Sequence, residues 1–271
     1  MKKILITLLV AGLTMATLFA GGSSESGSQT VTVGGSTSVE SVILSAIEIF
    51  NENNPDIVIT YDPTGSSTGV KGAVSGDYDI GLASRDVKES ETKEFNAVGT
   101  VFAIDGIAII VNNQNTVSDL SVSQIADIAS GKVTNWSEFG NQDAPIVLIG
   151  REAGSGTRDG FESIVGVDEC VYEQELTSTG GVIAAVSQNA NAIGYASLAA
   201  IDEKIKAITV EGIVASEATI KDGSYKMQRN FNFVTVEGKA LSESAKAFFD
   251  FVLSAQADEL ILSAGAVPTA K

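Results

Sequence analysis

The sequence predicts an α/β fold in which several loops of similar composition meet around one anion. In three places an apolar run typical of a buried strand leads into a loop rich in Gly, Ser and Thr, and apolar residues at helical spacing follow. The three loops are residues 34–38, 64–69 and 150–158. A helix start presents unpaired backbone N–H groups and the positive end of the helix dipole, so it favours negative charge. Strand ends lie together in an α/β sheet, and the three loops therefore predict one site for a polyoxyanion.

The first 20 residues have the pattern of a cleaved export signal. Two lysines precede a mostly apolar run from Ile4 to Ala20, and small residues follow this run. The run is slightly short for a membrane-spanning helix and contains Thr and Gly. We expect cleavage near residue 20 and a Gly/Ser-rich tether over residues 21–29. The mature protein is then expected in the periplasm or at the cell surface.

Composition removes several classes of function. The formal net charge is −17 at pH 7, and so acidic a surface disfavours nucleic acid and anionic membranes. The sequence has no histidine, which excludes Ser-His-Asp and Cys-His catalysis and histidine-ligated zinc. The acidic residues show no metal-ligand spacing, and Asp77 and Asp79 are the nearest pair to one. The lone Cys170 cannot form an internal disulfide, and its apolar neighbours predict a half-buried position. We expect a binding protein, not an enzyme, with no catalytic residue, metal or cofactor.

Strands are predicted where apolar and β-branched residues run together between Gly, Pro or Asn residues. The first strand alternates, whereas two runs near the middle of the chain are apolar enough to be central strands. In chain order, we expect strands at residues 30–33, 57–61, 79–84, 101–104, 106–112, 145–149, 192–196, 207–210 and 231–236.

Helices are predicted where apolar residues recur three and four positions apart. In the first helix this stripe runs from Val39 to Phe50, and a segment with several Asn residues and a Pro ends it. Trp136 stands alone in a turn and is interpreted as a packing residue. In chain order, we expect helices at residues 39–50, after the loop at 64–69, and at 117–130, 159–167, from 182 onward, 245–253 and 257–262.

The loop at 150–158 carries the most specific chemistry. Arg151 is a permanent cation whose planar fork fits a tetrahedral oxyanion, and Ser155 and Thr157 add hydroxyl donors. Gly154 and Gly156 let the backbone approach a ligand closely. A single loop of this kind is equally consistent with a capped helix beside a surface arginine. The recurrence of the pattern favours the anion site, and the lack of Walker or dinucleotide glycine spacing argues against a nucleotide.

Five segments carry a resemblance to a known family. In order, they resemble motifs of the phosphate-binding proteins of bacterial ABC-type phosphate import systems, and together they cover most of the chain after the export signal. The segments are residues 35–39, 64–69, 79–85, 151–157 and 191–195. The resemblance implies a two-lobed periplasmic-binding-protein fold of type II, with a ligand cleft between the lobes and two crossovers. Lobe 1 is expected to hold residues 30–110 plus 232–271, and lobe 2 residues 111–231.

The resemblance also implies which residues hold the anion. When the family's motifs are matched to this sequence position by position, the implied donors lie at helix starts in both lobes. The set comprises Thr37, Ser38 and Ser66 from lobe 1 and Arg151, Ser155, Gly156 and Thr157 from lobe 2.

Arg85 departs from the better-known pattern of this family. Well-studied members carry an aspartate there, which accepts the proton of hydrogen phosphate, whereas an arginine resembles a second subgroup. Because Arg85 follows a buried strand near the other donors, we expect it to face the cleft and bind the anion, rather than to turn outward toward Asp86 or Glu89. The proton acceptor stays open, with Asp62, Asp86 and Glu152 as candidates.

The resemblance implies an exported, monomeric receptor that binds inorganic phosphate and presents it to a membrane ABC permease. Two other classes of function stay open. One is a receptor for another oxyanion, such as sulfate, molybdate or a phosphonate, which a competition titration distinguishes. The other is a phosphate-ester hydrolase, which an assay for phosphate release distinguishes. A phosphate-dependent sensor or adhesin is not separated from a transport receptor by the sequence.

Overall fold

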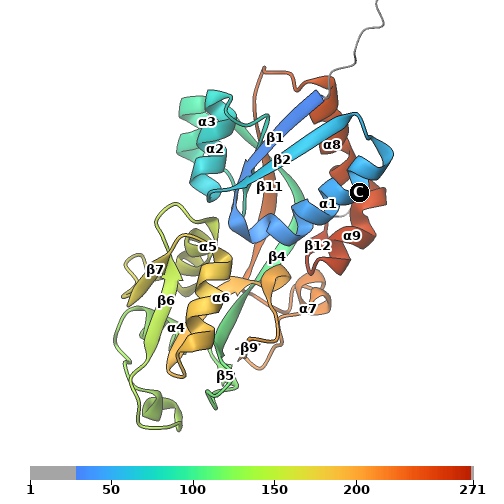
Figure 1. Cartoon of the computed structure of the whole chain (residues 1–271). Helices are drawn as coiled ribbons and strands as arrows, with labels where there is room; N and C mark the ends of the chain where they lie inside the picture. Colours follow the sequence, from blue (N-terminus) through green and yellow to red (C-terminus); the bar gives the residue numbers. More distant parts are fainter. Residues whose placement is uncertain (1–28, 270–271) are drawn as a thin grey trace, which may run out of the picture.

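The computed structural model describes residues 29–269 (Figure 1). The predicted export signal and residues 21–28 of the predicted tether lie outside the described residues, and Gln29 already belongs to the first strand. Within the described part, no helix is long and apolar enough to cross a membrane.

Strands and helices alternate along the chain, as the predicted α/β fold requires. The first half contains β1 (Gln29–Gly35), η1 (Thr37–Val39), α1 (Glu40–Asn53), β2 (Ile57–Pro63), α2 (Ser66–Ser75), β3 (Ile80–Ala83), α3 (Glu89–Phe95), β4 (Ala97–Asn112), β5 (Asp119–Leu120), α4 (Val122–Ala129) and η2 (Trp136–Phe139). The second half contains β6 (Val147–Arg151), α5 (Gly156–Val165), β7 (Gln174–Leu176), α6 (Thr179–Gln188), β8 (Ala192–Ser197), η3 (Leu198–Ala200), β9 (Ile205–Ala207), β10 (Thr209–Val210), α7 (Glu217–Lys221), β11 (Gln228–Val236), α8 (Glu243–Leu253), η4 (Ala255–Ala257), α9 (Asp258–Ser263) and β12 (Val267–Pro268).

One sheet runs through the molecule in the order β2-β1-β3-β11-β4-β8-β6-β7, and β9 and β12 pair with β4 beside this path. β1 lies parallel to β2 and β3, and β6 lies parallel to β7 and β8. β4 and β11 pair antiparallel in the centre. The carboxyl ends of the parallel strands carry the predicted loops, so these loops lie at the middle of the molecule.

β4 divides the sheet into two lobes. Its residues up to Gly106 pair with β11, whereas Ile107 and later residues pair with β8. We call lobe 1 the part built around β1, β2, β3 and β11, and lobe 2 the part built around β6, β7 and β8; they are the upper and lower masses in Figure 1. β4 and the segment entering β11 at Gln228 are the two crossovers between the lobes. The lobe boundaries predicted at 110/111 and 231/232 fall a few residues after these points and stay a prediction.

The lobes have separate apolar cores. In lobe 1, α1, α8 and α9 contribute to the core, and the ring centroids of Phe102 and Phe233 lie 4.7 Å apart. In lobe 2, the largest cluster includes Phe161 and Tyr195, whose rings stack with centroids 4.2 Å apart. Each large apolar side chain stabilises the fold by about 1.5–3 kcal/mol when fully buried. Because the cores are separate, each lobe can keep its own structure, and the two crossovers determine how the lobes are placed relative to one another.

Glycines bring the first two loops together in lobe 1. Gly35 has a φ of +137°, and a Cβ added there would lie 2.2 Å from the carbonyl oxygen of Leu82. A Cβ at Gly69 of α2 would lie 2.4 Å from the same oxygen. The N–H groups of Thr64 and Gly65 both donate to the Gly35 carbonyl at 2.7 Å. These contacts leave no room for a side chain, and they hold the start of α2 against the end of β1.

Two expectations about elements are wrong, and one helix was not predicted. The helix predicted at 117–130 is the short strand β5 followed by α4, whose first turn is capped by the Ser121 hydroxyl. The strands predicted at 101–104 and 106–112 form the single strand β4, because Asp105 is buried and paired rather than a break. No element was predicted for the region of α3, although Glu91 completes a hydrogen-bonded first turn there.

Two expectations about single residues are confirmed. Trp136 is fully buried, and its Nε1 donates to the carbonyl oxygen of Asn191 at 3.0 Å, so it is a packing residue. Cys170 is half-buried. Burial raises the pKa of its thiol, which keeps the sulfur protonated and weakly reactive.

Candidate anion-binding site

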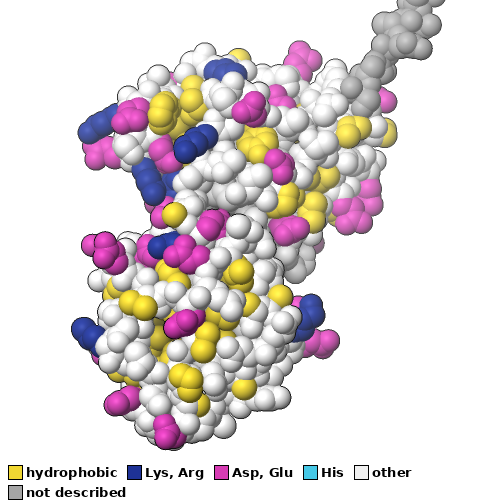
Figure 2. Space-filling view, turned by 60° about the vertical axis from the view of Figure 1, so that its left-hand side comes forward, with side chains coloured by type: hydrophobic (Ala, Val, Ile, Leu, Met, Phe, Trp, Pro, Cys, Tyr) yellow, Lys and Arg dark blue, Asp and Glu magenta, His cyan; other side chains and the backbone are white. Residues whose placement is uncertain are grey.

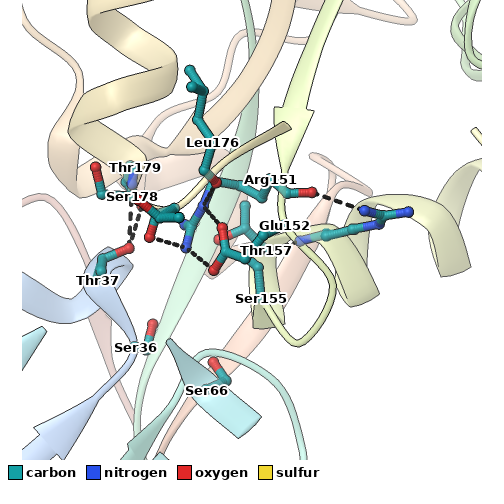
Figure 3. Close-up of polar contacts among 12 residues, drawn as sticks. Ser36, Thr37, Ser66, Arg151, Glu152, Ser155, Thr157, Leu176, Ser178 and Thr179 are labelled. Carbon is teal, nitrogen blue, oxygen red and sulfur yellow. Dashed lines mark hydrogen bonds and ion pairs between the residues drawn. The ribbon is translucent and has the colours of Figure 1, made fainter. Parts of the chain in front are cut away.

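Helix starts from both lobes bring their first residues together (Figure 3). η1 and α2 come from lobe 1, and α5 and α6 come from lobe 2. The hydroxyl oxygens of Ser36, Ser155 and Ser178 cap η1, α5 and α6. Capping uses a lone pair of each oxygen, so the hydroxyl hydrogens remain for a ligand. The positive ends of these helices favour an anion between them.

A buried cluster of hydroxyl groups joins the lobes. We call Thr37, Ser38, Thr157 and Thr179 the hydroxyl cluster. Ser38 Oγ lies 2.7 Å from Thr157 Oγ1 and 3.0 Å from Thr179 Oγ1. Thr37 Oγ1 lies 3.2 Å from Thr179 Oγ1 and accepts the N–H of Thr179 at 3.2 Å. Two of these residues belong to each lobe, and each hydroxyl can turn to donate to an anion oxygen.

Arg151 places a positive charge beside the hydroxyl cluster. Its side chain is only 2% exposed, and Nη1 donates to Thr179 Oγ1 at 3.1 Å. Nε and Nη2 donate to the carboxylate of Glu152 at 3.0 and 2.9 Å, and also to the carbonyl oxygens of Leu176 and Thr177 at 3.1 and 3.2 Å. A guanidinium has five N–H groups. Among the described residues, one N–H of Nη1 therefore remains for a ligand.

Tyr195 fixes the strand end that carries Arg151. Its hydroxyl oxygen accepts the backbone N–H of Arg151 at 3.1 Å and lies 3.0 Å from the hydroxyl of Tyr172. Burial raises the pKa of Tyr195, so the hydroxyl stays protonated. The motif at 191–195 therefore supports the site through the backbone of Arg151.

Ser66 extends the site along the contact between the lobes. Its Oγ accepts the N–H of Ser84 at 3.0 Å and lies 3.2 Å from Ser84 Oγ. A Cβ added at Gly156 would lie 2.4 Å from Ser66 Oγ and 2.7 Å from Ser84 Oγ. The N–H of Ser67 donates to the carbonyl of Gly154 at 3.0 Å, which is a backbone bond between the lobes. Only glycine at 156 lets α5 come this close.

The structure thus brings together all the predicted anion donors except one. A groove of about 230 Å³ reaches the hydroxyl cluster from solvent, with Lys204 on its wall. That these donors bind an anion stays a prediction. The donors brought together are Thr37, Ser38, Ser66, Arg151, Ser155, Gly156 and Thr157.

Arg85 is the exception, and its geometry corrects the expectation that it faces the anion. Nη1 and Nη2 donate to the two carboxylate oxygens of Glu91 at 2.9 and 2.7 Å. They also donate to the carbonyl of Asp86 at 2.9 Å and to Ser67 Oγ at 3.2 Å, and Nε lies 2.9 Å from Asp159 Oδ2. The N–H groups of Nη1 and Nη2 are thus all engaged, whereas Nε forms an ion pair with Asp159 without a hydrogen bond. Arg85 is neither a free anion donor nor part of an exposed pair.

The ion pairs of Arg85 connect the lobes instead. Glu91 belongs to lobe 1 and Asp159 to lobe 2, and Lys88 Nζ also lies 2.9 Å from Asp159 Oδ2. Burial alone would raise the pKa of Glu91, but hydrogen bonds from Arg85 and Lys88 outweigh it and lower the pKa. Figure 2 shows basic and acidic side chains gathered where the lobes meet. This network stabilises the contact between lobes.

Two residues of the site were missed in the sequence. Thr179 opens α6 in the segment 177–181, which follows β7 and repeats the pattern of strand, hydroxyl-rich loop and helix start. The signal was present, but β7 is short and polar, and so it was not recognised as a strand. Ser84 was counted as a strand residue, although its hydroxyl contacts Ser66. Within residues 29–269, no group of three or more His, Cys, Asp and Glu residues could hold a metal ion.

The chain matches a known family over most of its length. Residues 20–256 match the model of a PBP superfamily domain. A solved chain from Clostridium perfringens, described as a candidate phosphate ABC transporter substrate-binding protein with bound phosphate, is 39% identical, with a TM-score of 0.86 over 89% of this chain and 100% of that one. The chain belongs to the phosphate-binding proteins of the PBP superfamily.

Further phosphate-binding proteins of this superfamily cover similar lengths. The ABC-type phosphate transport receptor from Vibrio cholerae is 31% identical, with a TM-score of 0.72 over 88% of this chain and 100% of that one. The phosphate-binding protein PstS of Borreliella burgdorferi is 27% identical over 98% of both chains. The family and the fold class expected from the sequence motifs are confirmed.

Proposed function

We propose that this chain is an exported receptor that binds one inorganic phosphate ion between its lobes and delivers it to a membrane ABC permease. The observation that carries the proposal is the hydroxyl cluster, to which both lobes contribute beside the buried guanidinium of Arg151. Hydroxyls, helix N–H groups and one arginine suit a tetrahedral oxyanion. The relatives named for phosphate binding and phosphate transport support phosphate as the ligand.

Binding follows from an exchange of hydrogen bonds. Hydroxyls that contact one another in the cluster turn toward the phosphate oxygens, and the remaining N–H of Arg151 Nη1 joins them. Charge-assisted bonds of this kind contribute about 1.5–3 kcal/mol each. Because the donors belong to both lobes, a phosphate ion contacts all of them only when the lobes are together. The ion therefore selects the closed arrangement, which the permease can distinguish.

Glu152 is the acceptor that we assign to the proton of hydrogen phosphate. Asp62 and Asp86 accept hydrogen bonds from side chains outside the cluster. Glu152 pairs with Arg151, and its Oε1 would lie 3.4 Å from a Cβ at Gly65, so it reaches the start of α2 in the opposite lobe. Sulfate carries no proton at neutral pH, so it offers this carboxylate no hydrogen-bond donor and only like-charge repulsion. Glu152 thus favours phosphate over sulfate.

The proposed receptor is exported and has no enzymatic activity. The first 20 residues supply the export signal, which places the receptor outside the cytoplasmic membrane. The chain carries no histidine, and the donors of the site hold an anion without activating a nucleophile. The receptor acts as a monomer and meets the permease transiently.

Thermal unfolding tests the choice of ligand. A ligand at one hundred times its Kd stabilises the folded state by about 2.7 kcal/mol. For a chain of this length, that raises Tm by roughly 5–10 °C. We expect this shift with millimolar phosphate, a much smaller shift with equal sulfate or molybdate, and no phosphate release from p-nitrophenyl phosphate. An equal shift with sulfate would assign the site to another oxyanion, and phosphate release would indicate a hydrolase.

Asp159→Asn is expected to weaken phosphate binding modestly, by up to about fivefold. The change removes the charge that Arg85 and Lys88 contact across the lobes, so the closed arrangement loses two ion pairs but no ligand contact. Calorimetry at low and high salt measures the effect, which should shrink at high salt because exposed charges are screened. Glu89→Gln, which removes an exposed partner of Lys93 within α3, is the matched control. An Asp159→Asn affinity equal to that of the control at low salt would contradict this role.

A further inference from the structure

Arg229 is another buried arginine close to the site. It lies on β11 where this crossover strand begins, and it is 8% exposed. Its Nη1 donates to Ser84 Oγ at 3.2 Å and to the Ser84 carbonyl at 3.3 Å. Ser84 in turn contacts Ser66, the donor at the start of α2. A single serine therefore connects Arg229 to a predicted phosphate donor.

Asp105 holds this guanidinium at the crossover between the lobes. Nε and Nη2 of Arg229 donate to Asp105 Oδ2 at 3.1 and 2.9 Å, and Asp105 is fully buried. The other carboxylate oxygen accepts the hydroxyl of Ser197 in lobe 2 at 2.8 Å. The guanidinium carbon also lies 5.5 Å from the ring centroid of Phe231. These contacts fix the position of Arg229 and balance its charge. Arg229 therefore acts on the site by orienting hydrogen bonds and not by long-range attraction of the anion.

The direction of the hydrogen bonds follows from what each group can donate. Arg229 offers only N–H groups, so Ser84 Oγ is the acceptor in their contact. Ser66 Oγ accepts the backbone N–H of Ser84. If the Ser84 hydroxyl also donates to Ser66 Oγ, 3.2 Å away, the lone pairs of Ser66 are filled and its own hydrogen points outward. Arg229 favours this order because it already occupies a lone pair of Ser84.

We propose that Arg229, held by Asp105, is a positioning residue of the phosphate site: it orients the Ser84 hydroxyl so that Ser66 donates to the ligand. The inference rests on the proposed phosphate-binding function. A chain of donors that begins at a cation strengthens each successive bond. Without Arg229, the Ser66 hydroxyl is free to donate to Ser84 instead, and the phosphate loses a donor.

A double-mutant cycle on phosphate affinity tests this role. Calorimetry compares the wild-type chain with Ser84→Ala, Arg229→Lys and the double variant. Lysine keeps the charge near Asp105 but loses the fork that reaches Ser84. We expect each single change to weaken phosphate binding by about tenfold, and the double variant to bind no more than about threefold more weakly than either single variant. If the fold-change in Kd of the double variant is much smaller than the product of the two single fold-changes, Arg229 acts on phosphate binding through Ser84.

Tyr225→Phe is the matched control for a purely structural role. Tyr225 is fully buried at the same crossover and donates to the carbonyl of Ile107 at 2.9 Å, and it has no hydrogen bond to Ser84. Its loss should lower Tm and leave the phosphate Kd unchanged. If Arg229→Lys does not fold, the neutral pair Asp105→Asn with Arg229→Gln replaces it in the cycle.

Two results would overturn the inference. In one, the wild-type chain binds phosphate, but the folded Arg229 variant keeps the wild-type Kd or its effect multiplies fully with that of Ser84→Ala. In the other, the wild-type chain binds no phosphate, which would overturn the proposed function as well. The wild-type titration therefore distinguishes failure of the positioning role from failure of the function.

Discussion

Arg151→Met is expected to weaken phosphate binding by about a hundredfold or more while the chain stays folded. Arg151 brings the cation of the site, and its Nη1 contacts Thr179 within the hydroxyl cluster. Loss of its one charge-assisted bond, worth about 1.5–3 kcal/mol, together with its positive charge leaves the phosphate facing neutral donors. A loss of about 2.7 kcal/mol corresponds to a hundredfold in Kd. Glu152 loses its partner but is partly exposed, so the fold tolerates the change.

Calorimetry with phosphate, together with the Tm of the ligand-free variant, measures this effect. Arg151→Lys should recover only part of the affinity, because the ammonium group has no planar fork. Lys93→Met removes one exposed positive charge of lobe 1 and serves as the control for net charge. A folded Arg151→Met variant with wild-type affinity would show that the loop at 150–158 is only a helix cap.

Gly156→Ala is expected to lower phosphate affinity by more than tenfold through the contact between lobes. The new methyl group would lie 2.4 Å from Ser66 Oγ and 2.9 Å from the carbonyl carbon of Ser84, so the lobes cannot come as close. The clash involves lobe 1, whereas Gly156 belongs to lobe 2. Each lobe can therefore fold unchanged, and alanine even favours the α5 helix relative to glycine.

Gly180→Ala is the matched control for this change. Gly180 also lies in the first turn of a lobe 2 helix beside the hydroxyl cluster, but a Cβ there meets nothing within 4 Å. Phosphate titrations of both variants, with melting curves in the absence of phosphate, make the comparison. Equal affinities of the two variants would mean that close approach at Gly156 is not needed for binding.

The strand, loop and helix pattern was enough to predict the fold because local signals agreed with the final packing. Thr37, Ser66 and Thr157 all follow strands whose ends meet at the middle of the molecule. Apolar spacing and loop composition are both local, so the sequence shows them directly. Thr179 has the same pattern, and it was missed only because β7 is short and polar.

The pattern of strand, loop and helix does not predict the direction of the Arg85 side chain. Its partner Glu91 lies on α3, a helix with no buried residue and hence no apolar stripe to predict it. Its other partner, Asp159, comes from the opposite lobe. An arginine beside a predicted anion site turns to whichever acceptors the fold brings near, and these depend on tertiary packing. For the same reason the pairing of Asp105 with Arg229 could not be predicted from sequence.

Calorimetric titration of the purified chain, stripped of bound phosphate, measures the central claim most directly. Phosphate is titrated alone and then in the presence of excess sulfate. We expect saturation at one phosphate per chain, a submillimolar or tighter Kd, and little competition from sulfate. No heat with millimolar phosphate, or full competition by sulfate, would contradict a phosphate receptor built on Arg151 and the hydroxyl cluster.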